Sequence, residues 1–137
     1  MSVTLSIGMK QSLTKTVTEE DIEFFARATG DMNPLHLDES YARSTRFGGR
    51  IAHGLLGAGL ISAILGTLLP GPGTVYLSQK LTFTAPVRIG DRITASVEVK
   101  SIKQRRVSLK TICVNQDGNI VIDGEAEVLA PSSGDSA

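Results

Sequence analysis

The feature that most constrains this chain is one long apolar segment, residues 53–69 (HGLLGAGLISAILGTLL). It is shorter than the roughly twenty apolar residues that a membrane-spanning helix needs, so we expect a buried core helix instead. Gly54, Gly57, Gly59 and Gly66 interrupt the segment. Because each glycine costs a helix interior about 1 kcal/mol relative to alanine, we expect another backbone or a ligand to approach the helix closely there.

The residues after this helix alternate in polarity, as half-buried strands do, and no further helical pattern appears. Residues 69–73 (LPGPG) are the strongest break in the chain and predict the turn from helix to sheet. Strands are expected over residues 75–85, 93–100 and 106–114. The Asp-Gly pair at 117–118 predicts a hairpin into a last strand. In the first and last of these strands the following residues are expected to face inward: Val75, Leu77, Leu81, Phe83 and Ala85, and Ile120, Ile122, Gly124, Ala126 and Val128.

One buried helix beside a long-stranded antiparallel sheet is the pattern of an α+β hotdog fold, in which the sheet wraps around the helix. Such strands leave sheet edges that need protection, and pairing two copies of the chain covers them. The 137 residues, 41% of them hydrophobic, can bury one modest core, which fits a single domain over residues 1–130. The small polar tail, residues 131–137, is expected to fray.

Before the apolar helix, the sequence predicts a short strand and two short helices. Residues 10–17 fit the strand. Thr18 is placed to cap the first helix, with acidic residues in its first turn, and Gly30 is placed to end it. A second short helix is expected after its cap, Asp38. The first helix therefore stops just before Asp31.

Between these two helices lies DMNPLH, residues 31–36, which holds a carboxylate and an imidazole close together. Pro34 disfavours the helical region for Asn33 and has no N–H, so we expect a rigid, partly extended loop. Such a loop can direct Asp31 and His36 into one small volume, as a general base and a general acid acting on one substrate require. The alternative is structural: Asp31 follows a helix cap and His36 is an ordinary loop residue, because Asx-Pro turns are common.

Charge and cysteine content exclude several classes of function. The 14 basic and 14 acidic residues give zero formal charge, so we expect no overall attraction to nucleic acid or to an anionic membrane. The only cysteine, Cys113, allows no internal disulfide, supplies too few thiols for a zinc site and fits a buried structural thiol. The first residues show no signal-peptide pattern, so a reducing cytoplasm is the expected compartment.

Four segments form a combination that is specific although each segment alone is weak. They are D-x-N-P-x-H at residues 31–36, F-G-G-R-I-A-H-G at 47–54, the glycine-bearing apolar helix, and L-T-F-T-A-P-V-R-I-G-D at 81–91. Together they resemble the MaoC-like hydratase/dehydratase family, and within it the short single-hotdog (R)-specific enoyl-CoA hydratases, over residues 9–129. The resemblance implies a hotdog domain with a short helical and loop overhang that carries the active site. It also implies a homodimer with the acyl chain entering along the interface.

The resemblance further implies a reaction, the reversible hydration of a trans-2-enoyl-CoA to the (R)-3-hydroxyacyl-CoA. This hydro-lyase chemistry belongs to fatty acid metabolism and to the supply of polyhydroxyalkanoate precursors. We expect Asp31 to be the base that activates water, His36 to hold that water and share in proton transfer, and Asn33 to orient the pair. No metal or redox cofactor is called for, and the coenzyme A thioester is the substrate.

Residues of the apolar helix join the expected site. The free helix N-terminus near Gly54 offers N–H donors, and the resemblance implies that its N–H faces the thioester oxygen as an oxyanion hole. Ser62 falls where these hydratases have a serine near the active site; the alternative is a buried hydroxyl bonded to the carbonyl four residues back. For His53, the structural alternative is a buried histidine that braces the loop.

The substrate's two ends have separate candidates. Residues around Leu65, Leu68 and Leu69 are expected to line a narrow apolar channel for short or medium acyl chains. The basic candidates for the CoA phosphates are Arg88, Arg92 and Lys103. Three other functions stay open: 3-hydroxyacyl-thioester dehydration on acyl-carrier protein, acyl-CoA hydrolysis by a hotdog thioesterase, and non-catalytic acyl binding. Release of free thiol would indicate the thioesterase, and tight binding without turnover the acyl-binding subunit.

Overall fold

A computed structural model describes residues 4–132 of the chain. The elements follow one another as β1 (Lys10–Thr16), α1 (Glu19–Thr29), α2 (Pro34–Leu37), α3 (Glu39–Arg43), α4 (Gly54–Thr67), β2 (Val75–Phe83), β3 (Arg92–Lys103), β4 (Arg106–Val114) and β5 (Ile120–Leu129). All the predicted strands and the long helix are present. The fraying expected for residues 131–137 falls mostly outside the described range and stays a prediction.

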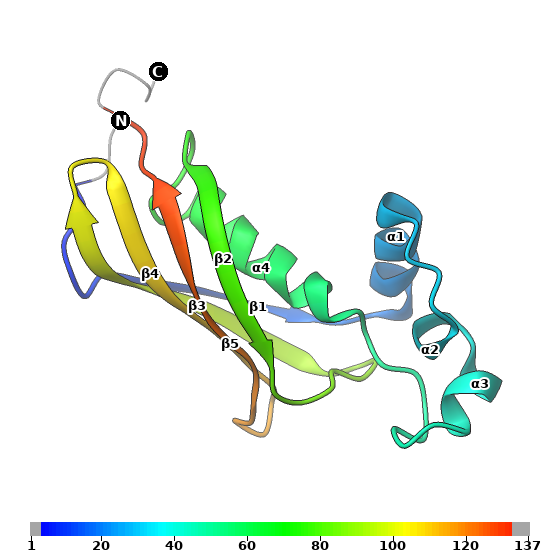
Figure 1. Ribbon diagram of the computed structural model, residues 1–137. Coiled ribbons are helices and arrows are strands. Elements are labelled where there is room, and N and C mark those ends of the chain that lie inside the picture. The colour runs from blue at the N-terminus through cyan, green and yellow to red at the C-terminus, as the bar shows by residue number, and fades with distance from the viewer. Residues whose placement is uncertain (1–3, 133–137) are drawn as a thin grey trace.

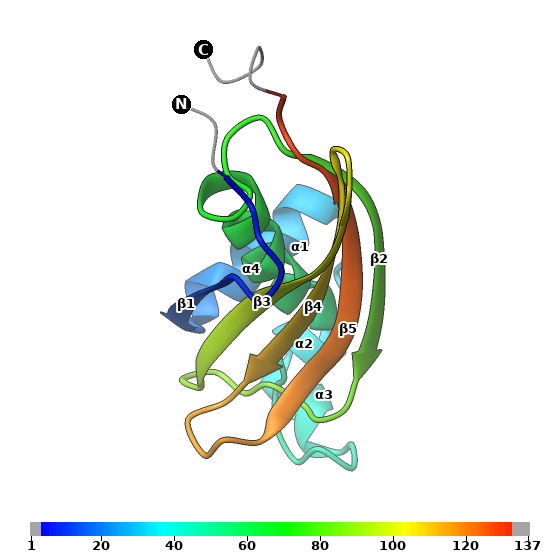
Figure 2. The ribbon, with the colours of Figure 1, turned by 90° about the vertical axis from the view of Figure 1, so that its left-hand side faces the viewer.

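The strands form one antiparallel sheet in the order β1-β3-β4-β5-β2. The sheet curves around α4, while α1, α2 and α3 stand apart from the sheet beyond one end of that helix (Figures 1 and 2). This is the predicted hotdog arrangement, with one central helix and a helical overhang. Within residues 4–132 no helix combines the length and the hydropathy needed to cross a membrane.

The core lies between α4 and the concave face of the sheet. Ile61, Ile64 and Leu65 of α4 are almost fully buried. They meet the inward residues of the central strands, which include Ile93, Ala95, Val97, Val99, Val107, Leu109, Val121 and Val128. Cys113 joins this core as a free thiol, and burial raises its pKa to about 12. The predicted buried structural thiol is confirmed.

Close approach explains only some of the glycines in α4. A Cβ on Gly57 would lie 2.3 Å from Ile122 Cδ1, and one on Gly54 would lie 2.7 Å from Phe83 Cε1. The neighbours are side chains of the sheet, whereas a backbone or a ligand was predicted. At Gly59 no atom of the described residues lies within 4 Å of the added Cβ. At Gly54 and Gly57 the close approach comes from side chains of the sheet, and the expected approach of a ligand to the helix stays a prediction.

Two strand predictions need correction. Ile120 was expected to face inward, yet it is 43% exposed, and Val121 is buried instead. The ladder between β4 and β5 shifts register between Cys113 and Val114, which turns the start of β5 over. The predicted inward face of β2 is also largely open, since Val75, Leu77 and Phe83 are exposed. These side chains are exposed because β2 forms the edge of the sheet.

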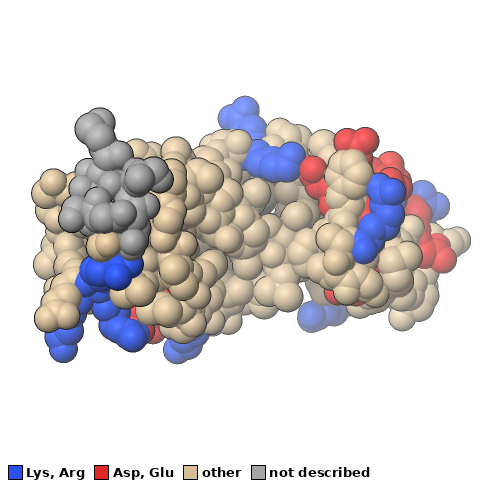
Figure 3. Space-filling model, turned by 90° about the horizontal axis from the view of Figure 1, so that it is seen from above, with Lys and Arg blue, Asp and Glu red and all other residues tan. Residues whose placement is uncertain are grey.

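The overhang begins as predicted and then departs from the prediction. Thr18 and Asp21 form a capping box at the start of α1, and Gly30 ends the helix with a φ of 81°. Figure 3 shows acidic side chains gathered mainly at the end of the molecule that the overhang forms. The segment after Asn33 is not an extended loop, because Pro34 occupies the first turn of the short helix α2. Asn33 itself stays non-helical, with a ψ of 122°, and caps α2.

Candidate active site

A cavity of about 760 Å³ opens where the N-terminal end of α4 meets the overhang and the sheet. Asp31 and His36 line it from the overhang, and His53 and Gly54 line it from the start of α4. The remaining wall is mostly apolar and comes from α1, α4 and the strands; it includes Phe25, Leu56, Leu60, Phe83, Ile93, Val121 and Ile122. An apolar cavity with a few convergent polar groups is the usual form of a small-molecule site.

Asp31 is positioned by the end of α1 and by its own local turn. Its N–H donates to Thr29 Oγ1 at 3.1 Å, and its Oδ1 accepts the N–H of Asn33 at 3.2 Å. The residue is exposed toward the cavity side of the overhang. These contacts fix the carboxylate at the rim while leaving it accessible to a substrate or a water molecule.

His36 is 8% exposed and sits in α2. Its Nδ1 lies 2.7 Å from the Ile51 carbonyl oxygen. Because a carbonyl only accepts, Nδ1 carries the hydrogen, and in the neutral ring Nε2 is left as an acceptor. The backbone is held as well: Arg50 Nε donates to the His36 carbonyl at 2.7 Å, and Arg50 Nη1 contacts Glu19 Oε1 at 2.6 Å. The imidazole is thus locked in one orientation and one tautomer.

His53 is the N-cap of α4 and is 3% exposed. Its Nε2 donates to the Asp31 carbonyl oxygen at 3.1 Å. Its ring stacks on His36, with centroids 4.0 Å apart, and on Phe25 at 4.6 Å. Burial lowers the pKa of His53 below its usual range; the hydrogen bond to Asp31 opposes this effect, and the nearby His36 adds to it. The structural alternative, a buried histidine bracing the loop, describes its contacts accurately.

The N-terminus of α4 faces the cavity without a side-chain cap. The first N–H groups of an α-helix have no partner within the helix, and they carry a partial positive charge. Gly54 begins the helix and lines the cavity. A larger residue there would strike the Phe83 ring, so the sequence keeps this end of the helix open.

Other predicted site residues lie elsewhere. The Asn33 side chain accepts the Leu35 N–H at 3.0 Å as the cap of α2, so it supports the helix that carries His36 but does not line the cavity. Ser62 is exposed on α4 and is not part of the cavity wall. The hydroxyl bond to the carbonyl four residues back, which was the alternative for Ser62, is made on this helix by Thr67 to Ala63. The structure does not bring Ser62 to Asp31 and His36 within one chain.

The leucines predicted to hold the acyl chain are at the other end of α4. Leu65 and Leu69 are buried in the core, and Leu68 is 44% exposed. None of the three lines the cavity. The structure instead places Leu56 and Leu60, one helical turn apart, along its wall.

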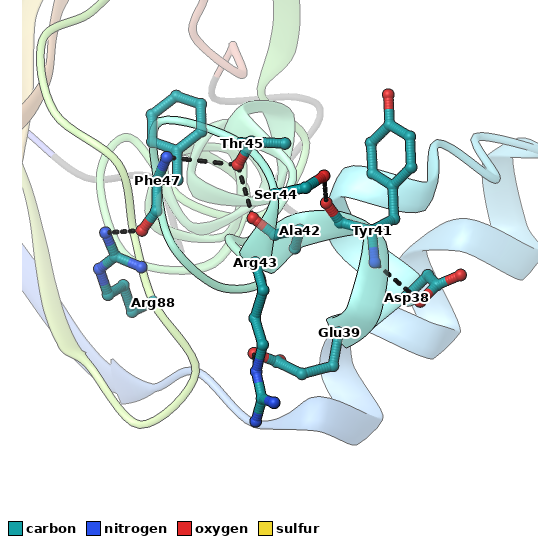
Figure 4. Close-up of polar contacts among 9 residues, drawn as sticks. All are labelled: Asp38, Glu39, Tyr41, Ala42, Arg43, Ser44, Thr45, Phe47 and Arg88. Carbon is teal, nitrogen blue, oxygen red and sulfur yellow. Dashed lines mark hydrogen bonds and ion pairs between the residues drawn. The ribbon is translucent and has the colours of Figure 1, made fainter.

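Only one of the three basic candidates for the CoA phosphates lies at the cavity. Arg88 lines the cavity, whereas Arg92 and Lys103 do not. Figure 4 shows how Arg88 reaches across to the turn after α3, where its Nη2 donates to the Phe47 carbonyl at 2.7 Å. Arg46, which the sequence reasoning missed, also lines the cavity and lies over the Phe47 ring at 4.7 Å.

The turn that carries Phe47 is built from short-range bonds (Figure 4). Thr45 Oγ1 donates to the Ala42 carbonyl at 2.6 Å and accepts the Phe47 N–H at 3.2 Å. Thr45 therefore continues the end of α3 into an ordered rim beside the cavity. The segment F-G-G-R-I-A-H-G contributed to the family resemblance, but nothing in its pattern indicated that Phe47 would line the site.

The polar residues of the cavity are of types that could also bind a cation. One ligand-capable atom from each of Asp31, His36 and His53 lies within 4.8 Å of the others. His36 Nδ1 and His53 Nε2 bind carbonyl oxygens, and the two rings are stacked with an angle of 35° between their planes. The same cluster can handle protons, because the Asp31 carboxylate and His36 Nε2 can each accept one.

Comparison with known proteins gives a consistent set of matches. The family model described as MaoC like domain matches residues 4–120. The (R)-specific enoyl-CoA hydratase of Rhodospirillum rubrum is 50% identical over 93% of this chain and 89% of its own length. The 3-hydroxybutyryl-CoA dehydratase of Methylorubrum extorquens is 52% identical over 93% of this chain and 82% of its own length.

A solved structure supports the same relationship. The (R)-hydratase of A. caviae involved in PHA biosynthesis superimposes with a TM-score of 0.90. It is 41% identical to this chain, and the match covers 93% of this chain and 98% of that one. The similarity therefore extends over almost the whole of both proteins.

Proposed function

The chain belongs to the family of MaoC-like domains, and from this premise we propose that it is an (R)-specific enoyl-CoA hydratase. It adds water reversibly to a trans-2-enoyl-CoA and gives the (R)-3-hydroxyacyl-CoA, a hydro-lyase reaction. The observation that supports this most is the convergence of Asp31, His36 and the uncapped N-terminus of α4 on one largely apolar cavity. By likeness to the A. caviae enzyme, its product supplies polyhydroxyalkanoate synthesis.

Asp31 and His36 act together on one water molecule in this mechanism. Nε2 of His36 accepts one hydrogen bond from the water and orients it, while the Asp31 carboxylate takes its other proton. The water oxygen then bonds to the β-carbon, and the proton returns through the same pair to the α-carbon. The hydroxyl group and the proton are both delivered from the side of the cavity that holds Asp31 and His36, so the addition is syn. Both residues end in their starting protonation states, so the catalyst is regenerated.

The thioester oxygen gains negative charge as the new C–O bond forms. In our proposal the N–H of Gly54 donates to that oxygen, and the partial positive charge at the start of α4 stabilises the enolate. One such donor is typically worth about 10²- to 10³-fold in rate. The chemistry is acid–base throughout, so we propose that it needs no metal or redox cofactor, and a chelator should leave activity unchanged.

The acyl chain follows the apolar wall of the cavity. Leu56, Leu60 and Ile93 offer it a hydrophobic surface, and each buried methylene should add roughly 0.8 kcal/mol to binding until the cavity ends. The CoA phosphates would meet basic side chains at the mouth. Arg46 and Arg88 line the cavity and are our candidates for this contact.

We also propose that the chain is a homodimer in the cytoplasm. β2 is an edge strand, and strand pairing with a second copy would satisfy its open backbone edge and help to cover the exposed Val75 and Leu77. Any part for Ser62 in the reaction would require such a neighbour, because Ser62 is exposed and does not line the cavity of its own chain. Light scattering at micromolar concentration should give the dimer mass, and a monomer mass would contradict the proposal.

A panel of thioesters tests the function. Enoyl-CoA substrates of increasing chain length should lose their enoyl absorbance and yield the (R)-3-hydroxy product on chiral analysis. The same acyl groups on acyl-carrier protein should react more slowly; faster reaction there would indicate an acyl-carrier-protein dehydratase. Free thiol released from saturated acyl-CoA would instead identify a thioesterase. Tight binding without any turnover would identify an acyl-binding subunit.

A further inference from the structure

We propose that His53 is a positioning residue that holds the two halves of the catalytic pair in register and does so as a neutral imidazole. The inference rests on the proposed hydratase function, because it assigns His53 a part in that reaction. The residue touches the backbone of Asp31 and the ring of His36, and it is not expected to touch the substrate.

His53 adds a direct contact between Asp31 and the His36 ring, beside the local turn of Asp31 and Asn33 and the Arg50 link between α1 and His36. Asp31 is held by bonds at the end of α1, and His36 is held by Ile51 and Arg50. The hydrogen bond from His53 Nε2 to the Asp31 carbonyl and the ring contact with His36 join them. Phe25 packs on the ring of His53 as well. A residue that sets the distance between a base and its partner affects the rate, since about 1 Å of misplacement costs about 10²-fold.

The neutral state of His53 follows from its surroundings. Its Nδ1 is buried and has no hydrogen-bond partner among the described residues. Protonation would place an unpaired N–H donor at Nδ1 and a full positive charge on the buried ring, and both are costly. The titratable groups that act on the ring are His36, which opposes a positive charge, and Asp31, which favours it. Burial also lowers the pKa of His53, in agreement with this arrangement.

The consequence is a division of roles between two stacked imidazoles. Two positive rings with centroids 4.0 Å apart would repel each other strongly in a buried site. With His53 neutral, His36 can orient the water and share in proton transfer with Asp31 without a positively charged ring stacked on it. One histidine of the pair then takes part in the chemistry, and the other positions it.

Two substitutions separate the contacts of His53. His53→Phe keeps a ring between Phe25 and His36 and removes the N–H to the Asp31 carbonyl. His53→Gln keeps an N–H donor at about the position of Nε2 and removes the ring. We expect each to lower kcat for crotonyl-CoA hydration by about 10-fold or more with KM nearly unchanged, since misplacement of catalytic groups by a fraction of an ångström to 1 Å costs up to about 10²-fold. Ile64→Ala, at a buried position of α4 outside the cavity, is the control for destabilisation and should keep kcat.

A second readout does not depend on hydration. The chain has 2 histidines, so both imidazoles can be followed by ¹⁵N NMR without ambiguity. We expect His53 to show the neutral Nε2–H tautomer at neutral pH, and we expect the His36 ring signals to shift in both variants. If wild-type protein does not hydrate enoyl-CoA, the proposed function fails and the NMR result alone decides this inference.

Two results would overturn the inference. The first is kcat within twofold of wild type in both folded variants. The second is a His53 ring that protonates at or above the ordinary pKa of a histidine, with His36 signals unmoved by either substitution.

Discussion

At its C-terminal end α4 is closed by backbone hydrogen bonds, whereas at its N-terminal end it is left open. Leu68 N–H and Leu69 N–H both donate to the Ile64 carbonyl, and Gly71 N–H donates to the Leu65 carbonyl. At the other end no side chain caps the helix, and the cavity begins at its first residue. Both ends belong to one apolar helix, so the apolar pattern does not distinguish them.

The difference between the two ends lies in which polar groups are satisfied. The closed end buries leucines and pairs its carbonyls, so substitutions there should change stability. The open end keeps unpaired donors and holds Asp31, His36 and His53 within 4.8 Å of one another. Unsatisfied groups and crowded titratable side chains occur where function requires them. Substitutions at this end should change the rate more than the stability.

The largest expected effect is at the open end. His36→Ala should lower kcat for crotonyl-CoA hydration by about 10²- to 10⁴-fold, or roughly 3 to 5.5 kcal/mol of barrier, because it removes one of two groups that act on the water. Combined with Asp31→Asn, the loss should be smaller than the product of the two, since residues that act as a unit are not additive. Measurements of kcat on folded protein give the losses for the single variants and for the double variant. Full multiplicative losses would show that the two residues act independently.

The closed half of the helix should respond in the opposite way. Ile64→Ala removes a fully buried side chain from the core and should lower the free energy of unfolding by about 2 to 5 kcal/mol. Urea unfolding measures this, and the kcat of the remaining folded enzyme should stay near the wild-type value. A large loss of kcat in fully folded Ile64→Ala would show that the two ends are coupled.

Asn33 lies between these extremes, because it stabilises the helix that carries His36. Asn33→Ala should cost about 0.5 to 2 kcal/mol of stability by removing the cap of α2. Asn33→Ser, which can still accept the Leu35 N–H, is the matched control and should lose little. Equal stability of the two variants in thermal unfolding would mean that the cap contributes nothing.

The smallest effect concerns pH. The pKa of His53 is lower in the folded protein than the ordinary value of roughly 6.5, so the unfolded chain binds this proton first as pH falls. Folding stability should therefore decrease below about pH 6.5, by at most about 1.4 kcal/mol per pH unit from this residue. His53→Phe should lose less stability over the same interval. Identical pH dependence in both proteins would rule out this contribution.

Local signals predicted most of the fold. The capping box at Thr18, the glycine at Gly30 and the alternating strands depend on neighbouring residues, so they are visible in the sequence. The start of β5 was misassigned because the register shift beside Cys113 leaves Val121 as an extra residue in the hairpin ladder of β4 and β5, which the alternation of polarity does not reveal. The helix α2 was missed because Pro34 was read as a break, although proline also fits the first turn of a helix.

The site was only partly predictable from the sequence. Asp31 and His36 are neighbours in sequence, so one short motif pointed to both. The walls of the cavity come from segments distant in sequence, such as Phe25, Leu60 and Phe83, and no local pattern assigns them to one pocket. The acyl-channel prediction chose the closed end of α4, because the apolar pattern is alike at both ends.

The measurement that tests the account most directly is kcat for crotonyl-CoA hydration by Asp31→Asn, taken together with its thermal unfolding. This change keeps the shape and the hydrogen bonds of the side chain but removes the basic oxygen. We predict unfolding near the wild-type temperature and a loss of kcat of about 10²-fold or more, as expected for a general base. A folded Asp31→Asn enzyme that keeps more than about a tenth of wild-type kcat would show that Asp31 is not the base. The proposed mechanism would then be wrong.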